Sequence, residues 1–196
     1  MTVLKKLVLA THNHGKIQEL QGLLAPLGIE VLSSKDFDWV EPIENGNTFN
    51  ANARIKAKAV FHATGLPSLA DDSGLVVECL GGQPGVDSAS WLGPQKDPKL
   101  AIARLEKEVG DATNLAAKFI TVLAFQKAKD DILFFQGECA GRLTFPPRGD
   151  QGFGFDPVFI PEGETRTFAE MSNGEKSALS HRGKALRNFL EYLKHA

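Results

Sequence analysis

The residues best suited to chemistry stand in four short polar clusters along a chain of 196 residues. The first, Thr11 to Lys16, joins Thr11, Asn13, Gly15 and Lys16 between a β-type run and a helical one. Backbone N–H groups at a helix start attract anions, and a lysine in the first turn adds a positive charge. A plain capping loop with a solvated lysine is the alternative. The spacing is not that of a Walker loop.

Carboxylates form the second cluster, in Glu44-Asn45-Gly46 and Asp71-Asp72-Ser73-Gly74. Consecutive carboxylates repel each other, and a hard divalent cation relieves that repulsion. Mg²⁺ is usually held by one or two carboxylates together with phosphate oxygens. The structural alternatives are a tight turn at Asn45-Gly46 and a turn with one N-cap residue at Asp71-Asp72.

The third cluster is Gly152-Phe153-Gly154-Phe155-Asp156, and the fourth contains Lys176, His181 and Arg182 ahead of the last helix. Glycines beside an aromatic ring allow close backbone approach next to a face on which a base can stack. Core aromatics on a bulged strand and a solvated helix start are the alternatives. The four clusters together supply the parts of a nucleoside triphosphate site.

The hydrophobic pattern predicts the elements that must position these clusters, and it favours an α/β fold. Residues 7–10, 29–32, 75–80, 117–125 and 132–143 are typical of strands. Helices are expected at residues 17–27, 49–64, 98–109 and 184–194, with Thr48 and Asp97 as N-caps. The last two strands can form a hairpin around residues 127–131. No linker or repeat divides the chain, so we expect one domain over residues 1–196.

Composition narrows the class of protein. The formal net charge is −2, which argues against a non-specific nucleic-acid or membrane-surface protein. No stretch approaches the roughly 18 apolar residues of a membrane span. Cys79 and Cys139 show no metal-type spacing, and His12 and His14 lack a third ligand, so a zinc site or disulfide framework is not expected. A cytoplasmic location is the resulting expectation.

The clusters, in their order and spacing, resemble the inosine triphosphate pyrophosphatases, also called the Ham1 or non-canonical purine NTP pyrophosphatase family, in its bacterial form. The motifs that carry the resemblance are Ala10–Lys16, Leu69–Leu75, Leu80–Gly85, Gly152–Pro157, Glu175–Ala178 and Ser180–Gly183. The resemblance implies an elongated mixed sheet with helices around two lobes, and a nucleotide cleft between them. It also implies a homodimer and Mg²⁺-dependent hydrolysis of ITP, dITP and XTP to the monophosphate and pyrophosphate.

The same resemblance implies roles for single residues. The triphosphate loop would comprise Thr11, His12, Asn13, His14, Gly15 and Lys16. Glu44 and Asp72 would hold the metal, with Asp72 or its neighbour Asp71 activating water and Lys16 neutralising the phosphates. The remaining substrate contacts would be Ser73, Phe153, Gly154, Phe155, Asp156, Lys176, His181 and Arg182.

Two positions depart from the family pattern. Ala51 stands where a glutamate is common, which puts a second acidic metal contact in doubt, and Ser90 stands where an arginine is common. Two other functions remain open: a pyrophosphatase for other modified nucleotides, and a nucleotide sensor that binds without turnover.

Overall fold

The computed structural model describes residues 4–11, 14–37 and 39–195. Six strands form one mixed sheet in the order β2-β1-β3-β4-β5-β6, with helices against it. This confirms the α/β prediction. The chain divides into two compact units. Unit 1 comprises residues 1–72, 122–135 and 186–196, and unit 2 comprises residues 73–121 and 136–185. Two units agree with the two lobes that the resemblance implied, whereas the single functional domain and its cleft stay predictions.

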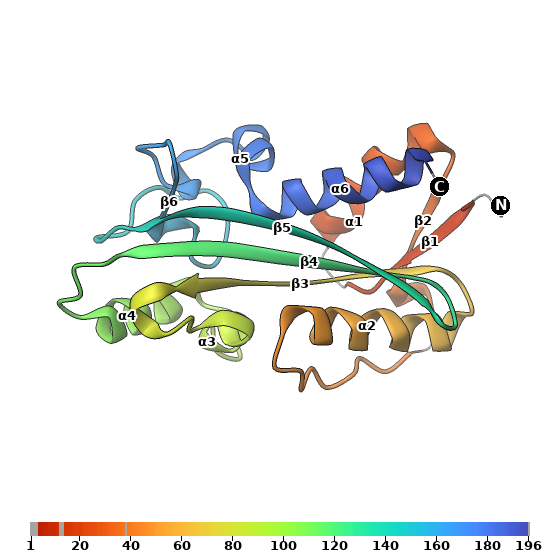
Figure 1. Ribbon diagram of the computed structural model, residues 1–196, viewed down its shortest axis with the longest axis horizontal. Coiled ribbons are helices and arrows are strands. Elements are labelled where there is room, and N and C mark those ends of the chain that lie inside the picture. Colours follow the sequence, from red (N-terminus) through yellow and green to blue (C-terminus); the bar gives the residue numbers. More distant parts are fainter. Residues whose placement is uncertain (1–3, 12–13, 38, 196) are drawn as a thin grey trace. The chain divides into compact units, whose positions relative to one another are not determined.

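Unit 1 begins with a parallel β-α-β arrangement (Figure 1). β1 (Lys6–Leu9) pairs in parallel with β2 (Glu30–Ser33) and with the start of β3 (Ser68–Val77). The helix α1 (His14–Leu24) connects β1 to β2. Consecutive residues of β1 are buried, as expected for a parallel strand covered on both faces. Thr11 therefore lies between the end of β1 and the start of α1.

The helix α2 (Phe49–Thr64) has the predicted boundaries. Thr48 accepts a hydrogen bond from the backbone N–H of Ala51, and Gly65 closes the helix at φ 67°, where glycine avoids a Cβ penalty. The hairpin of β4 (Ala116–Ala128) and β5 (Asp131–Leu143) reaches unit 1 with its tip. There Phe125 and Phe135 pack at 5.3 Å against Phe189 of α6 (His181–His195).

Unit 2 encloses an aromatic core between its sheet and short helices. Its strands are the remaining parts of β3, β4 and β5, with β6 (Phe159–Pro161) antiparallel to β5. The helices are α3 (Ser88–Trp91), α4 (Pro98–Val109), α5 (Asn173–Leu179) and the first turn of α6. Asp97 caps α4 through the Lys99 N–H, as predicted. The largest core side chains include Trp91, Leu105, Phe119, Phe159 and Phe168.

The structure overturns two of the structural alternatives and moves predicted element boundaries. Asp71 and Asp72 lie in the middle of β3, a continuous strand of ten residues, and not in a turn. That strand ends at Val77, because residues 78–80 form a 3₁₀ turn that Gly81 closes at φ 62°. The segment around Phe153 consists of bends and turns, so the alternative of a bulged core strand is wrong. In addition, α6 begins at His181, three residues earlier than expected.

Candidate functional site

A carboxylate cluster in unit 1 contains Glu44, Asn52, Lys56, Asp71 and Asp72. Glu44 comes from the loop before α2, Lys56 from α2 and the two aspartates from β3. The Lys56 Nζ lies 2.8 Å from Glu44 Oε2 and 3.9 Å from Asp72 Oδ1. The Lys56 and Asp72 side chains are each only 12% exposed, so these charges act on each other with little screening by water.

Asn52 ties the Glu44 loop to the same helix. Its Oδ1 accepts a hydrogen bond of 2.8 Å from the backbone N–H of Gly46, two residues after Glu44. A Cβ at position 46 would lie 2.6 Å from both Asn52 Oδ1 and the Ala51 Cβ, so only glycine allows this approach. The close approach to α2 explains this glycine, whereas the tight-turn alternative is wrong because residues 41–46 form no turn.

Burial and neighbouring charges shift the pKa values of Asp72 and Lys56 in this cluster. Burial raises the pKa of Asp72 to about 6, against the lowering effects of the Lys56 charge and of a side-chain hydrogen bond from Asn52. Burial also acts to lower the pKa of Lys56. Attraction to Asp71, Glu44 and Asp72 and the Glu44 hydrogen bond outweigh it, and the pKa of Lys56 is raised. A buried carboxylate with a pKa near neutrality is typical of functional sites.

The donor set of the cluster fits a hard cation. Asp72 Oδ2 is buried and finds no hydrogen-bond partner among the described residues. Carboxylate oxygens of Glu44 and Asp72 are ligands that Mg²⁺ prefers. Within residues 4–11, 14–37 and 39–195, no three His, Cys, Asp or Glu side chains group closely enough to hold a metal by themselves. A cation here would therefore take further ligands from substrate oxygens or water, which is the usual situation for Mg²⁺.

The predicted phosphate loop is described only in part. Thr11 follows β1 and is half-buried, and the adjacent Ala10 N–H donates to the Leu69 carbonyl, which ties the loop to β3. His12 and Asn13 lie outside the described residues. His14, Gly15 and Lys16 form the start of α1, as a helix-start anion site requires, but their side chains also lie outside the described part. The phosphate-binding role of this loop stays a prediction.

In unit 2, Phe153, Asp156, Phe168 and Lys176 form an aromatic cluster. The Phe153 ring is 68% exposed, and the Lys176 ammonium lies 4.4 Å from its centroid. Lys176 also pairs with the buried Asp156 carboxylate, whose Oδ2 accepts the Phe153 N–H at 2.7 Å. An exposed ring held by its backbone beside a cation is suited to a planar, electron-rich ligand.

Two glycines frame the Phe153 ring. Gly152 has φ 77°, and a Cβ there would lie 2.1 Å from Asp156 Oδ2, so the turn requires glycine. Gly154 has φ 62°, and a Cβ there would meet nothing within 4 Å in the described chain. The Phe155 side chain, in contrast, is 4% exposed and belongs to the core. The substrate contact predicted for Phe155 could therefore involve only its backbone, because its side chain is buried.

The other predicted substrate residues have individual settings. His181 is buried and stacks on Phe119 with ring centroids 4.7 Å apart. A Cβ at Gly137 would lie 2.0 Å from the His181 carbonyl oxygen, so this glycine lets the first turn of α6 rest on β5. Ser73 shares a 2.7 Å hydrogen bond with Thr121, and Arg182 is half-buried in the same first turn of α6. Ser73, His181 and Arg182 thus all belong to unit 2.

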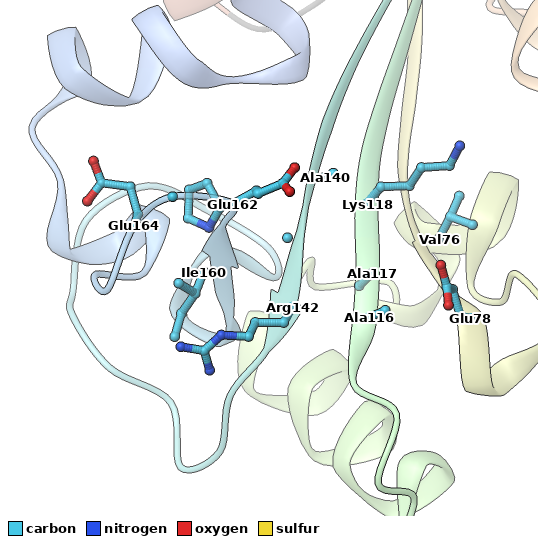
Figure 2. A pocket seen from close by; sticks show the side chains of 13 residues that line it. Val76, Glu78, Ala116, Ala117, Lys118, Ala140, Arg142, Ile160, Glu162 and Glu164 are labelled. Atoms are coloured by element: carbon cyan, nitrogen blue, oxygen red, sulfur yellow. The ribbon is translucent and has the colours of Figure 1, made fainter.

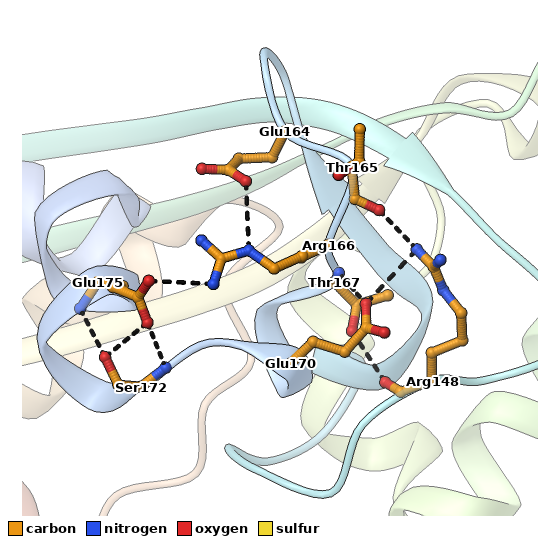
Figure 3. A network of polar contacts seen from close by, with 8 residues as sticks. All are labelled: Arg148, Glu164, Thr165, Arg166, Thr167, Glu170, Ser172 and Glu175. Carbon is orange, nitrogen blue, oxygen red and sulfur yellow. Dashed lines mark hydrogen bonds and ion pairs between the residues drawn. The ribbon is translucent and has the colours of Figure 1, made fainter.

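A polar network holds α5, which carries Lys176 (Figure 3). Ser172 and Glu175 form a capping box, and the Arg166 guanidinium donates to Glu175 at 3.0 Å. Hydrogen bonds from the Ser172 side chain and backbone, together with Arg166, lower the pKa of Glu175 to about 2. Arg148 donates to the Thr165 carbonyl at 2.9 Å and braces the preceding loop. The predicted alternative, a merely solvated helix start, does not describe Lys176.

Unit 2 also contains a cavity of about 400 Å³ on β4, β5 and β6 (Figure 2). Its charged lining residues are Glu78, Lys118, Arg142, Glu162 and Glu164. None of the predicted site residues is among its described lining residues. This cavity is therefore a feature apart from the carboxylate cluster and the aromatic cluster.

Two residues of the carboxylate cluster escaped prediction as site residues. Lys56 and Asn52 lie in an alanine-rich helix among several other polar residues, and such residues are normally solvated. Their spacing of four residues was the available signal, because it places both side chains on one face of α2. Their partners lie in a loop and in a strand that the sequence alone does not bring to that face.

The fold is of the α/β class, and each unit carries one cluster of predicted site residues: the carboxylate cluster in unit 1 and the aromatic cluster in unit 2. The chain belongs to the Ham1 family, whose family model matches residues 7–192. It is 51% identical to the dITP/XTP pyrophosphatase of Gluconobacter oxydans (strain 621H), over 94% of this chain and 89% of the relative. It is 46% identical to the dITP/XTP pyrophosphatase of Bradyrhizobium diazoefficiens, over 95% of this chain and 94% of the relative.

A solved structure has the same fold. The structure of a HAM1 protein from Coxiella burnetii matches with a TM-score of 0.94 and 36% identity, over 98% of this chain and 100% of that chain. The family that the sequence motifs indicated is thereby confirmed. Among the described residues, no helix has the length and apolar character needed to cross a membrane.

Proposed function

We propose that the protein is a nucleoside triphosphate pyrophosphohydrolase that converts ITP, dITP and XTP to the monophosphate and pyrophosphate. The observation that carries this proposal is the buried Asp72 carboxylate beside Glu44, one oxygen of which is unpartnered within the described chain. Relatives named dITP/XTP pyrophosphatase, at up to 51% identity over most of the chain, support the choice of substrates. Removal of deaminated purines from the nucleotide pool would be the result.

The carboxylate cluster would act on the phosphate chain. Glu44 and Asp72 are the residues that would hold Mg²⁺, which when bound would neutralise phosphate charge and stabilise the departing diphosphate. Asp72, or Asp71 beside it in β3, would orient or deprotonate the water that attacks the α-phosphorus. The Lys56 ammonium, 3.9 Å from Asp72 Oδ1, acts against burial to lower the pKa of Asp72. Lys16 would neutralise the phosphate tail.

The aromatic cluster would recognise the base. The exposed Phe153 ring offers a stacking face, and Lys176, Arg182 or the Gly154 N–H could donate to the oxygen at C6 of hypoxanthine and xanthine. ATP carries an amino group there, so a buried donor would stay unpaired at a cost of about 1–3 kcal/mol. Guanine also carries an oxygen at C6, and rejection of GTP must therefore act at C2.

We also infer a homodimer located in the cytoplasm. The homodimer rests on the family resemblance, and light scattering after size exclusion tests it. The cytoplasmic location has the additional support of two free cysteines, Cys79 and Cys139, which suit a reducing compartment. Cell fractionation with antibody detection tests the location.

The deciding experiment is pyrophosphate release from ITP, dITP, XTP, GTP and ATP, with Mg²⁺ and again with a chelator. We expect metal-dependent turnover of the first three and weak turnover of GTP and ATP. Release from other nucleotides only would keep the chemistry and overturn the choice of base. Saturable ITP binding without any turnover would replace the enzyme with a nucleotide sensor.

A further inference from the structure

Asn52 makes a contact that neither packing nor helix formation requires. Its side chain is 4% exposed on the first turns of α2, and its Oδ1 accepts the Gly46 N–H at 2.8 Å. Because Gly46 follows Glu44 by two residues, this bond fixes the loop that carries the Glu44 carboxylate. A Cβ at position 46 would lie 2.6 Å from Asn52 Oδ1, so the loop can pass this close to Asn52 because residue 46 is glycine.

The Nδ2 end of the same amide acts on Asp72. The Nδ2 group of asparagine is a donor, and the Asn52 side chain acts on the Asp72 carboxylate to lower its pKa. One planar group thus accepts a hydrogen bond from the Glu44 loop and presents a donor for Asp72 in β3. Lys56, one helical turn later on the same face, joins the same two carboxylates by charge. An ammonium attracts from many directions, whereas an amide constrains angle as well as distance.

We propose that Asn52 is a positioning residue that holds the Glu44 loop and Asp72 in the relation needed to share one divalent cation. This inference rests on the proposed function and deepens it. Removing a hydrogen bond that orients a metal-binding side chain typically lowers metal affinity or activity by about 10–100-fold. Asn52 touches neither the reacting atoms nor the cation in this scheme, so its effect passes through Glu44 and Asp72.

Two variants separate the two ends of the amide. Asn52→Leu keeps the number of side-chain heavy atoms and the branching at Cγ, and it removes both the acceptor and the donor of the amide. Asn52→Asp keeps an oxygen that accepts the Gly46 N–H and loses the donor toward Asp72. Asn50→Leu is the matched control, since Asn50 lies two residues earlier on α2 and is exposed. Circular dichroism establishes that each variant is folded before it is compared.

The readouts are Mg²⁺ binding by calorimetry without nucleotide, amide hydrogen exchange at Gly46, and kcat and KM for ITP. For Asn52→Leu we expect about 10–100-fold weaker Mg²⁺ binding and an equal loss of kcat, with KM within about threefold and faster exchange at Gly46. Asn50→Leu should match the wild type in all four. A folded Asn52→Leu with wild-type Mg²⁺ affinity and kcat would overturn the inference.

The remaining outcomes are also decisive. If Asn52→Leu does not fold, Asn52→Asp is expected to keep slow exchange at Gly46 and to lose at least about tenfold in kcat. Wild-type turnover in Asn52→Asp would reject the contact to Asp72. If the wild type itself releases no pyrophosphate, the proposed function fails, and Mg²⁺ affinity and Gly46 exchange still decide the role of Asn52.

Discussion

At the scale of single residues, the ionised Asp72 carboxylate is needed for the proposed activity but destabilises the folded protein. Its pKa in the folded protein, about 6, exceeds the ordinary value of 3.8, because burial disfavours the charged form. The folded state therefore binds this proton more tightly than the unfolded chain. The contribution of Asp72 to wild-type stability should fall as the pH rises from about 4 to 6, by at most about 3 kcal/mol.

Asp72→Asn cannot ionise and so escapes this penalty. We expect it to exceed the wild type in unfolding free energy at pH 8, with a smaller difference at pH 4.5, as urea titrations would measure. Its kcat should fall by about 10²–10⁴ if Asp72 is the base. Asp71→Asn is the matched variant that decides which aspartate activates water. An Asp72→Asn protein that is less stable than the wild type at pH 8 would contradict the burial argument.

Phe153 and Phe155 are two residues apart and should respond oppositely to truncation. Phe153 is mostly exposed, so Phe153→Ala should leave the melting temperature unchanged and raise KM for ITP. Base–aromatic stacking of about 1–3 kcal/mol corresponds to a rise of about 5–150-fold. Phe155 is in the core, and Phe155→Ala should lose about 3–5 kcal/mol of stability. Steady-state kinetics and thermal melts measure both, and an unchanged KM in Phe153→Ala would remove the stacking role.

At the scale of elements, the departure at Ala51 acquires a structural meaning. Thr48 is the N-cap of α2 and accepts from the Ala51 N–H, so position 51 is N3. A glutamate at N3 completes a capping box by reaching back to the N-cap N–H. The glutamate common in the family is therefore explained by capping, and its absence here does not require a lost metal ligand.

Ala51→Glu tests this explanation. The new carboxylate should stabilise the protein by about 0.3–1 kcal/mol, because it adds a cap and a negative charge near a helix N-terminus. Its kcat and Mg²⁺ requirement should stay those of the wild type. Chemical denaturation and a Mg²⁺ titration of pyrophosphate release provide the measurements. A marked fall in the Mg²⁺ concentration for half-maximal activity would restore the metal-contact interpretation.

The elements also explain what the sequence could and could not predict. Helix boundaries at Thr48 and Asp97 were correct because capping is a local property of a few residues. The turn considered as an alternative at Asp71 and Asp72 was wrong, because these carboxylates lie in a strand beside the Lys56 ammonium, which no local pattern reveals. Asn52 and Lys56 were missed for the same reason: their partners are distant in the sequence, and no local pattern contains them.

At the scale of the whole molecule, the two compact units are joined without a linker. β3, β4, β5 and α6 each cross from one unit to the other, at residues 72–73, 121–122, 135–136 and 185–186. Unfolding one unit alone would break backbone hydrogen bonds within three continuous strands and one helix. We therefore expect a single cooperative transition, as in a one-domain protein.

The two tryptophans report on the units separately. Trp39 belongs to unit 1, and Trp91 belongs to unit 2, where the Arg104 guanidinium lies 4.0 Å from its ring. In Trp39→Phe the fluorescence follows unit 2, and in Trp91→Phe it follows unit 1. In each variant the fluorescence midpoint in urea should coincide with that of far-ultraviolet circular dichroism at one protein concentration. Separate midpoints would mean that the crossing strands do not couple the units, and the carboxylate cluster could then be lost while the aromatic cluster persists.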